Sequence, residues 1–355
     1  MRAFSFYPYE RSCSKRGQRY FSAPHHRGIF LRATSSDGGF GVGEFAPHEG
    51  VHGLLMDHVM ALLDDLDHEK AAGIFSLSPD RSLGQLTHFF LAFPHPVSFM
   101  LSMAHWHYWY KRAKSWRTLA DDHVLLSAMI EHQSVDEAIA LAEQYLANGY
   151  SCIKVKVSSL PIEKEAIKIA AISDLASDGV SVRIDANGSL SFDDARFFLQ
   201  ELKGMRIEYI EDPLREPEQI PHLLSLADIN VALDAHLPSP NGLVATRKQG
   251  IRYLVIKPSR FHCIYALMDY VGRAQGHGLI PIFSHAFESE FSSSIYALLL
   301  GELGLLAHPA GIIAQDFFSQ GLGGRPAQTL SGQISLADAR SQALSDGTFM
   351  DLVQI

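Results

Sequence analysis

SCIKVKV (Ser151–Val157) is the first of five short apolar segments that decide the fold, and the other four are VSVRIDAN (Val180–Asn187), RIEYIEDP (Arg206–Pro213), NVALDAH (Asn230–His236) and YLVIKP (Tyr253–Pro258). Each segment carries an ionisable residue at or near its carboxyl end, and a stretch of helical length and pattern separates each from the next. Strands that alternate with helices and end in charged residues are typical of a (β/α) barrel, whose active site lies at the carboxyl ends of its strands. The sequence therefore predicts an α/β fold of this kind.

Three carboxylates fall at the ends of three consecutive predicted strands: Asp185, Glu211 and Asp234. Facing one another they would repel unless a cation lay between them, and a ligand set of oxygen atoms alone favours a hard divalent ion such as Mg²⁺, with Mn²⁺ as a substitute. Lys154 and Lys156 share one face of the preceding strand because side chains alternate along a strand. Lys257 ends the strand that follows. This set indicates a site for proton abstraction next to a carboxylate.

Each of these residues alone has a simpler explanation. An aspartate at a strand end often caps a helix or lies in a solvated loop, and lysines two positions apart can form the exposed face of an edge strand. Asp212-Pro213 can be turn chemistry. The joint pattern favours a site, because the intervals from Asp185 to Glu211, Asp234 and Lys257 each span one strand–helix unit.

Composition limits the classes of function. The chain has 355 residues, 47% of them hydrophobic and 19% charged, and its formal net charge is −9. This balance does not favour nucleic acid or anionic lipid as a partner. We see no signal peptide and no apolar run of membrane-spanning length, and the three cysteines are too scattered for a disulfide framework or a metal site. We therefore expect a cytoplasmic protein that acts on a small molecule.

The segments that flank the barrel have a different pattern. Strands are predicted at Arg2–Tyr9, His26–Thr34 and Gly39–Phe45, followed by helices at Val51–His68 and Pro96–Lys114. Strands followed by helices without alternation indicate an α+β unit. We predict this capping domain over residues 1–120, the barrel over 121–320 with a first strand at Val124–Ile130, and a C-terminal segment over 321–355 that returns to the capping domain.

The motifs together resemble those of the enolase superfamily, and more narrowly its muconate-lactonizing subgroup. They are the Lys-x-Lys strand, Asp-x-Asn after a strand, Glu-Asp-Pro, a third acid after an Ala-Leu strand, and Lys-Pro, and the likeness runs from about Gly39 to Asp316. It implies a modified (β/α)8-type barrel, written (β/α)7β, under an N-terminal α+β capping domain. It also implies that Lys156 is the base, that Lys154 is its positive neighbour, and that Asn187 and Asp212 support the metal ligands.

Within the subgroup, Ser284-x-Ala286-Phe287-Glu288-Ser289 resembles the strand-end motif of o-succinylbenzoate synthases, which are lyases of menaquinone biosynthesis. The likeness implies Mg²⁺-dependent dehydration of 2-succinyl-6-hydroxy-2,4-cyclohexadiene-1-carboxylate. Ser284 and Ser289 are then candidates for holding the succinyl tail, and His285 for contacting a substrate carboxylate.

The sequence departs from the family at two positions and leaves alternatives open. Ala235 follows Asp234 where the family usually has an acidic residue, and His285 stands in a pair that is usually small. An N-acylamino acid racemase or dipeptide epimerase on the same scaffold would use Lys257 as a second acid and base. The complete set of acids and lysines argues against a non-catalytic binding protein, and Lys257 stands where sugar-acid dehydratases use a histidine. Loops near Arg16–Pro24 and Pro47–His52 are expected to govern specificity, and the oligomeric state stays open.

Overall fold

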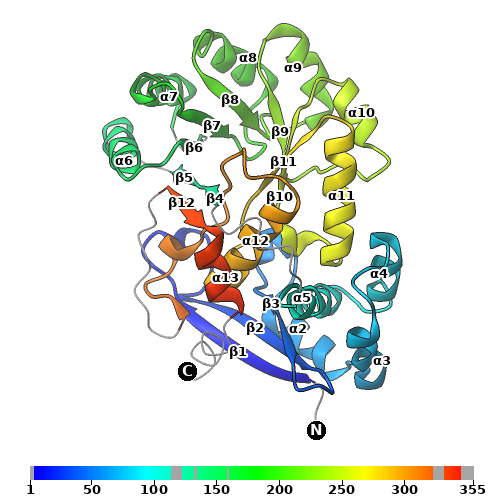
Figure 1. Cartoon of the computed structure of the whole chain (residues 1–355). Helices are drawn as coiled ribbons and strands as arrows, with labels where there is room; N and C mark the ends of the chain where they lie inside the picture. Colours follow the sequence, from blue (N-terminus) through cyan, green and yellow to red (C-terminus); the bar gives the residue numbers. More distant parts are fainter. Residues whose placement is uncertain (1–3, 113–121, 132–133, 158–159, 323–331, 345–355) are drawn as a thin grey trace.

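The centre of the molecule is a parallel sheet of seven strands that curls into a barrel (Figure 1). The computed structural model describes residues 4–112, 122–131, 134–157, 160–322 and 332–344. The sheet has the order β11-β10-β9-β8-β7-β6-β5, and its strands are β5 (Ser127–Ile130), β6 (Cys152–Lys156), β7 (Ser181–Asp185), β8 (Ile207–Glu211), β9 (Val231–Leu233), β10 (Tyr253–Ile256) and β11 (Ile280–Phe283). The five apolar segments with charged residues at their carboxyl ends form the neighbouring strands β6 to β10.

One short segment closes the barrel. Ala310 forms a parallel bridge with Leu126, just before β5, and Gly311 forms another with Ser284, just after β11. The amide of Ser127 donates to the Ala310 carbonyl at 3.0 Å, and the amide of Gly311 donates to the Phe283 carbonyl at 2.8 Å. Both edges of the sheet are therefore joined through residues 310 and 311, and the predicted α/β barrel is confirmed.

Helices follow the strands and cover the outside of the barrel (Figure 1). They are α6 (Val135–Ala147), α7 (Ile162–Leu175), α8 (Phe192–Glu201), α9 (Ile220–Leu226), α10 (Leu243–Lys248), α11 (Ile264–Gly276) and α12 (Glu290–Glu302). Ser134 and Glu137 form a capping box at the start of α6, and the Ser191 side chain caps α8. Single 3-10 turns lie at η1 (Gly17–Arg19), η2 (Gly73–Ser76), η4 (Pro217–Gln219), η5 (Pro258–Arg260) and η6 (Gln315–Phe317).

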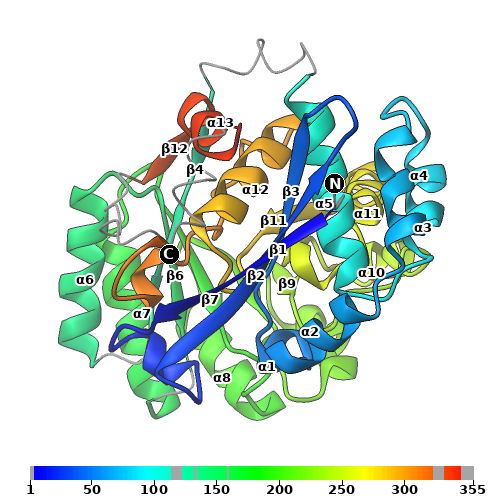
Figure 2. The same ribbon diagram turned by 90° about the horizontal axis from the view of Figure 1, so that it is seen from below.

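The capping domain is an antiparallel sheet of three strands packed against α5 (Val97–Tyr110), with α4 (Leu83–Phe90) beside it. Its strands are β1 (Phe4–Ser12), β2 (His25–Thr34) and β3 (Phe40–Phe45). Gly41 and Gly43 allow α5 to lie close to β3, because a Cβ atom at these positions would come within 1.8 Å and 2.0 Å of carbonyl oxygens of α5. Figure 2 shows this sheet lying in front of the barrel strands.

The continuous helix predicted for Val51–His68 is wrong. The chain forms three short helices there: α1 (Glu49–His52), α2 (Met56–Asp64) and α3 (His68–Ala72). Gly53 has a φ of 64°, the left-handed conformation that ends a helix. Asp67 then starts a new one, since its side chain accepts a hydrogen bond from the amide of Lys70. The helix-ending glycine and the helix-capping aspartate therefore divide a segment whose apolar residues have the spacing of one continuous helix.

The strand predicted for Val124–Ile130 is divided. Its first part, β4 (His123–Leu125), pairs antiparallel with β12 (Gln333–Ser335), and only β5 joins the barrel. β12 leads into α13 (Leu336–Leu344), which packs against α12 (Figure 1). The described part of the C-terminal segment therefore contacts the start of the barrel and α12. Its remaining residues, and the predicted boundary at 120, lie outside the described residues, so the domain limits stay predictions.

No described helix combines the length and the apolar character that crossing a membrane requires.

Candidate active site

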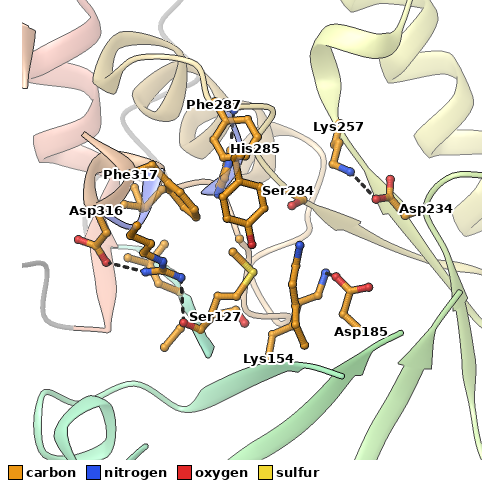
Figure 3. Close-up of a pocket in the computed structure, with 18 of the residues that line it drawn as sticks. Ser127, Lys154, Asp185, Asp234, Lys257, Ser284, His285, Phe287, Asp316 and Phe317 are labelled. Carbon is orange, nitrogen blue, oxygen red and sulfur yellow. Dashed lines mark hydrogen bonds and ion pairs between the residues drawn. The ribbon is translucent and has the colours of Figure 1, made fainter. Parts of the chain in front are cut away.

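A cavity of about 240 Å³ lies where the carboxyl ends of the barrel strands meet loops of the capping domain (Figure 3). The predicted site residues in its wall are Lys154, Lys156, Asp185, Asn187, Asp234, Lys257, Ser284 and His285. The capping domain adds Arg16, Tyr20, His48, Gly50 and Val51. Residues that are 300 positions apart in sequence therefore form one cavity, and most of the predicted charged set lines it.

Lys154 is the central cation of the site. Its Nζ lies 2.8 Å from Asp185 Oδ2 and 2.8 Å from Glu211 Oε2. Burial lowers the pKa of Lys154, but the two carboxylates outweigh burial and hold this pKa well above its ordinary value. The pKa of Asp185 shifts the other way: burial raises it, and Lys154 and Lys156 bring it below the ordinary value. Lys154 is therefore a fixed positive charge and not a proton acceptor.

Lys156 has a different environment although it lies two positions away on β6. It makes no ion pair within the described part of the chain, and its Nζ lies 4.9 Å from the centre of the Tyr20 ring. Burial lowers the pKa of Lys156, Lys154 lowers it further, and Asp185 offsets only part of this effect. A lysine with a lowered pKa can lose its proton more easily, which is the property a general base requires.

Lys257 lies across the cavity, at the end of β10. Its ammonium forms an ion pair with Asp234 (Figure 3). Arg260 Nη1 lies 3.2 Å from the other oxygen of the same carboxylate. The side chains of Lys257 and Asp234 are 19% and 15% exposed, so both reach the cavity. The site thus has lysines on two sides, from β6 and from β10.

The three predicted metal ligands follow consecutive strands, since Asp185 ends β7, Glu211 ends β8 and Asp234 follows β9. Within the described ranges, no group of three or more His, Cys, Asp or Glu side chains lies close enough together to hold a metal. Lysine and arginine nitrogens lie within ion-pair distance of all three carboxyl groups.

Glu211 provides a test of whether the residues fit a metal. It is 1% exposed, and burial together with Asp185 raises its pKa to about 8. An additional cation near this carboxylate would stabilise its ionised form. The donor set is made only of carboxylate oxygens, which suits Mg²⁺. The chemistry of the site therefore fits a divalent ion, provided that the lysine contacts give way to it.

Asn187 and Asp212 hold the strand ends in place. The backbone amide and the side-chain amide of Asn187 donate to Asp185 Oδ1 at 3.1 Å and 2.8 Å. Asp212 accepts hydrogen bonds from the backbone amides of Asp234 at 3.2 Å and Ala235 at 2.8 Å. The predicted supporting positions thus contact the predicted ligands or their backbone, which explains how Ala235 fits without a carboxylate of its own.

Backbone strain is concentrated in the same region. Asn187, Asp212 and Phe287 are the non-glycine residues with positive φ among those that the structure describes, at 47°, 39° and 69°. Each follows a strand that contributes to the site, β7, β8 or β11. Such conformations cost free energy and persist where surrounding contacts impose them.

The predicted substrate-binding residues all follow β11, and two of them, Ser284 and His285, line the cavity. His285 lines the cavity, and its Nδ1 accepts a hydrogen bond from the Phe287 amide at 3.2 Å. Burial and the nearby Lys257 keep the pKa of His285 well below its ordinary value. The ring is therefore neutral, and its remaining proton is on Nε2, where it can be donated to a substrate oxygen. Ser284 also lines the cavity (Figure 3).

Ser289 does not belong to the cavity wall. It is fully buried, and its hydroxyl donates to Glu44 Oε2 at 2.6 Å while its amide donates to Glu44 Oε1 at 2.8 Å. Glu44 belongs to β3, so Ser289 ties the barrel to the capping domain. This position removes the geometric basis for the predicted contact between Ser289 and substrate.

Several cavity residues were not identified from the sequence. Phe287, Phe317 and Asp316 line the wall, and Glu131 lies just behind it, bonded to Arg16 and Tyr20. Glu131 directly follows β5, so the strand-end pattern that identified the other acids would also have found it. Arg16, Tyr20 and His48 fall within the two loops expected to govern specificity, but no local pattern identifies which of their side chains face the cavity.

The sequence profile of enolase C-terminal domain-like proteins matches residues 137–338, which is more than half of the chain. The chain therefore belongs to this family.

Its curated relatives carry different activities. The chain is 27% identical over 173 residues to an o-succinylbenzoate synthase of Desulfotalea psychrophila, and the match covers 45% of this chain and 46% of that protein. It is 30% identical over 151 residues to a hydrophobic dipeptide epimerase of Roseobacter litoralis, which covers 41% of this chain and 44% of that one. The chain thus spans about half the length of the curated relatives it matches.

Solved structures resemble the whole chain. The crystal structure of MenC from Desulfotalea psychrophila has a TM-score of 0.76 at 19% identity, covering 94% of this chain and 99% of that one. An o-succinylbenzoate synthase from Thermosynechococcus elongatus with Mg in its active site has a TM-score of 0.69 at 21% identity, covering 93% and 96%. At these identities the likeness establishes the fold.

Proposed function

We propose that this protein is a Mg²⁺-dependent o-succinylbenzoate synthase. The observation that carries the proposal is the arrangement of Asp185, Glu211 and Asp234 at consecutive strand ends, with Lys154 and Lys156 on one side and Lys257 on the other. Among the family's activities, this one is supported by the strand-end motif from Ser284 and by relatives that carry its name. The substrate is 2-succinyl-6-hydroxy-2,4-cyclohexadiene-1-carboxylate, and the product would enter menaquinone biosynthesis.

Lys156 is the base in this proposal. It removes the proton next to the substrate carboxylate, and the C–H electron pair moves into the carboxylate to give a dianionic enediolate. Lys156, now protonated, gives the proton to the departing hydroxide, so that water leaves and the ring becomes aromatic. Its lowered pKa and the absence of an ion pair within the described residues suit it to the first step.

Asp185, Glu211 and Asp234 would hold Mg²⁺, or Mn²⁺ in its place. The bound ion would supply positive charge that stabilises the two negative charges of the deprotonated carboxylate. Lys154, on β6 beside these carboxylates, would contribute positive charge from the same side. Asn187 keeps Asp185 oriented through two hydrogen bonds.

Lys257 and His285 orient the ring and the second half of the substrate. Lys257 lies across the cavity from β6, where its ammonium can contact the ring face as a cation–π partner. His285 offers a neutral N–H donor, and Ser284 offers a hydroxyl, to an oxygen of the substrate. Both residues follow β11, next to the loops of the capping domain.

A racemase of N-acylamino acids or an epimerase of dipeptides is the second candidate. The observation that favours it is the placement of lysines on both sides of the cavity, on β6 and at the end of β10. With Lys156 and Lys257 on opposite faces of a Cα atom, one lysine could remove the proton and the other return it. Relatives named as epimerases match the chain at similar identity.

The test is turnover of the cyclohexadiene precursor by the purified protein, with Mg²⁺ and then with EDTA. Loss of the diene absorbance that requires Mg²⁺ supports the synthase. No turnover of the diene, together with exchange of the α-proton of N-acyl amino acids or dipeptides in D₂O, would overturn it and favour the second candidate. A Lys164→Ala variant is the control for both assays, since this lysine is exposed on α7.

A further inference from the structure

Glu131 is a buried carboxylate whose partners come from the capping domain. It directly follows β5 and is 1% exposed. The Tyr20 hydroxyl donates to its Oε1 at 2.5 Å, and Arg16 Nε lies 3.4 Å from its Oε2. Both donors belong to the loop between β1 and β2, more than 110 residues earlier in the chain. Each oxygen of one buried acid is therefore used by the same loop.

Arg16 reinforces this contact at two further points. Its Nη2 donates to the Met129 carbonyl of β5 at 2.9 Å, and its Nη1 lies 3.4 Å from Asp316 Oδ2 in η6. An ionised carboxylate is costly to bury without a cation or hydrogen-bond donors. Within the described residues, Glu131 obtains both from the loop, so release of the loop would leave the acid without them. The loop is therefore anchored at the end of β5 by a hydrogen bond from Tyr20 and an ion pair from Arg16.

The Tyr20 ring lies between Lys156 and the rings of Phe287 and Phe317. Its centre lies 4.9 Å from Lys156 Nζ, 5.5 Å from the centre of the Phe287 ring and 5.3 Å from that of Phe317, which it meets edge-on. The hydroxyl at the far end of the ring is the group that Glu131 holds. A fixed hydroxyl therefore fixes the ring beside the Lys156 ammonium.

We propose that Glu131 is a positioning residue that latches the β1–β2 loop, through Arg16 and Tyr20, so that the Tyr20 ring covers Lys156 and limits its contact with water. The proposal rests on the proposed function only in taking Lys156 as the base. Glu131 acts through Tyr20 and does not contact the substrate. The latch joins the first strand of the barrel to the capping domain at the point where the base is exposed.

The experiment measures the reactivity of the Lys156 amine without turnover, and Tyr20→Phe, which keeps the Glu131 charge that raises the pKa of Lys156, isolates the part due to exposure. Wild type, Glu131→Ala, Glu131→Gln and Tyr20→Phe proteins are methylated with formaldehyde and cyanoborohydride in the presence of Mg²⁺, and the labelled peptides are quantified by mass spectrometry. We expect Lys156 to be labelled about tenfold faster in Glu131→Ala, as expected for loss of a charge-assisted hydrogen bond. Glu131→Gln keeps an acceptor for the Tyr20 hydroxyl, so its rate of Lys156 labelling should lie between those of wild type and Glu131→Ala.

Limited trypsin digestion gives a second readout from the same loop. Cleavage after Lys15, Arg16 and Arg19 should rise about tenfold in Glu131→Ala and less in Tyr20→Phe, because each variant loosens the loop. The turnover number for whichever substrate the wild type accepts should fall in the same order. If Glu131→Ala does not fold, Tyr20→Phe carries the test, since it removes only the hydroxyl that Glu131 accepts.

Glu208→Ala is the matched control. Glu208 lies on β8, away from the loop, and its Oε2 is 2.7 Å from Nε of another buried arginine, Arg183. The substitution therefore also removes a carboxylate from a buried arginine. It should lower stability without a change in the labelling of Lys156 or in cleavage of the loop. Wild-type rates of labelling and cleavage in folded Glu131→Ala would overturn the latch. Failure of the diene assay would leave these readouts in place, so the latch and the proposed function fail separately.

Discussion

The two walls of the cavity differ in composition and in how they are held. One, the strand-end wall, consists of Lys154, Lys156, Asp185, Asp234 and Lys257, which lie on or directly after strands of the barrel. The other, the loop wall, consists of Arg16, Tyr20, His285, Phe287, Asp316 and Phe317. The strand-end wall is densely charged, whereas the loop wall is largely aromatic. Its histidine is neutral, and carboxylates neutralise its arginine.

We expect the strand-end wall to carry the reacting groups and the loop wall to determine which substrate fits. Hydrogen bonds between neighbouring strands hold the charged residues in register, as in the pairing of Lys156 with Asp185. The loop wall depends on contacts between side chains, such as the ring of Tyr20 against those of Phe287 and Phe317. Reacting groups on rigid elements keep their geometry, and loops can change to fit another substrate. One strand-end wall can therefore serve both candidate activities.

The largest effect is expected at Lys156, the proposed base on the strand-end wall. Lys156→Ala should lower the turnover number about 10²- to 10⁴-fold, the usual range for loss of a general base. Binding of Mg²⁺, measured by titration calorimetry, should change little because Lys156 makes no ion pair with a predicted ligand among the described residues. Full activity in this variant, with Lys164→Ala as control, would show that the base is elsewhere.

Glu211 should give the strand-end wall a pH-dependent stability when Mg²⁺ is removed. Its pKa is about 8 in the folded protein, against 4.5 for an ordinary glutamate. The folded state therefore keeps this proton to higher pH than the unfolded state, and stability is lost as the pH rises from about 4.5 to about 8. The loss approaches about 1.4 kcal/mol for each pH unit for one proton.

Urea unfolding in EDTA, compared with Glu211→Gln, isolates this contribution from the histidines that titrate in the same range. The difference in the free energy of unfolding between wild type and variant should decline with pH and level off above pH 8. Added Mg²⁺ should reverse the decline, because the ion stabilises the carboxylate. A difference that is flat with pH would mean that Glu211 is already ionised without metal.

Substitutions at His285 and Ser289, both after β11, should affect different properties: substrate binding and stability. His285→Ala should raise KM about tenfold, since it removes a hydrogen-bond donor from the cavity. Ser289→Ala should instead lower the free energy of unfolding by about 1–3 kcal/mol, because the buried Glu44 loses a donor. Steady-state kinetics and urea unfolding measure the two effects. A raised KM in Ser289→Ala at unchanged stability would return Ser289 to the substrate.

The sequence predicted the strand-end wall far better than the loop wall, for a physical reason. A strand has a period of two and a defined end, so the positions of Lys154, Lys156 and Asp185 follow from local pattern. Neighbouring strands of a barrel then bring their ends together without further information. The same rule identifies Glu131, which directly follows the last residue of β5. The start of β5 depends on a distant partner, because β12 pairs with β4 and separates β4 from the barrel strand.

The loop wall depends on partners that are distant in the chain. Tyr20 contacts Glu131, Phe287 and Phe317, and no local period relates these positions. Ser289 illustrates the error that follows: it lies in a motif at a strand end, but Glu44 from β3 binds its hydroxyl. The helix predicted from Val51 failed for a local reason, because Gly53 and Asp67 divide the apolar pattern.

The smallest effect, at Asp316, bears on the charge of the substrate. The Asp316 side chain is 55% exposed and lies 3.4 Å from Arg16, so Asp316→Asn should change the free energy of unfolding by less than about 1 kcal/mol. A succinyl carboxylate in the cavity would be repelled by Asp316, and its neutralisation should then lower KM by about twofold to fivefold. The ammonium of a dipeptide would be attracted, and the same variant should raise KM by a similar factor. Because the two signs are opposite, even a small change measured at low salt tells which charge the loop wall accepts.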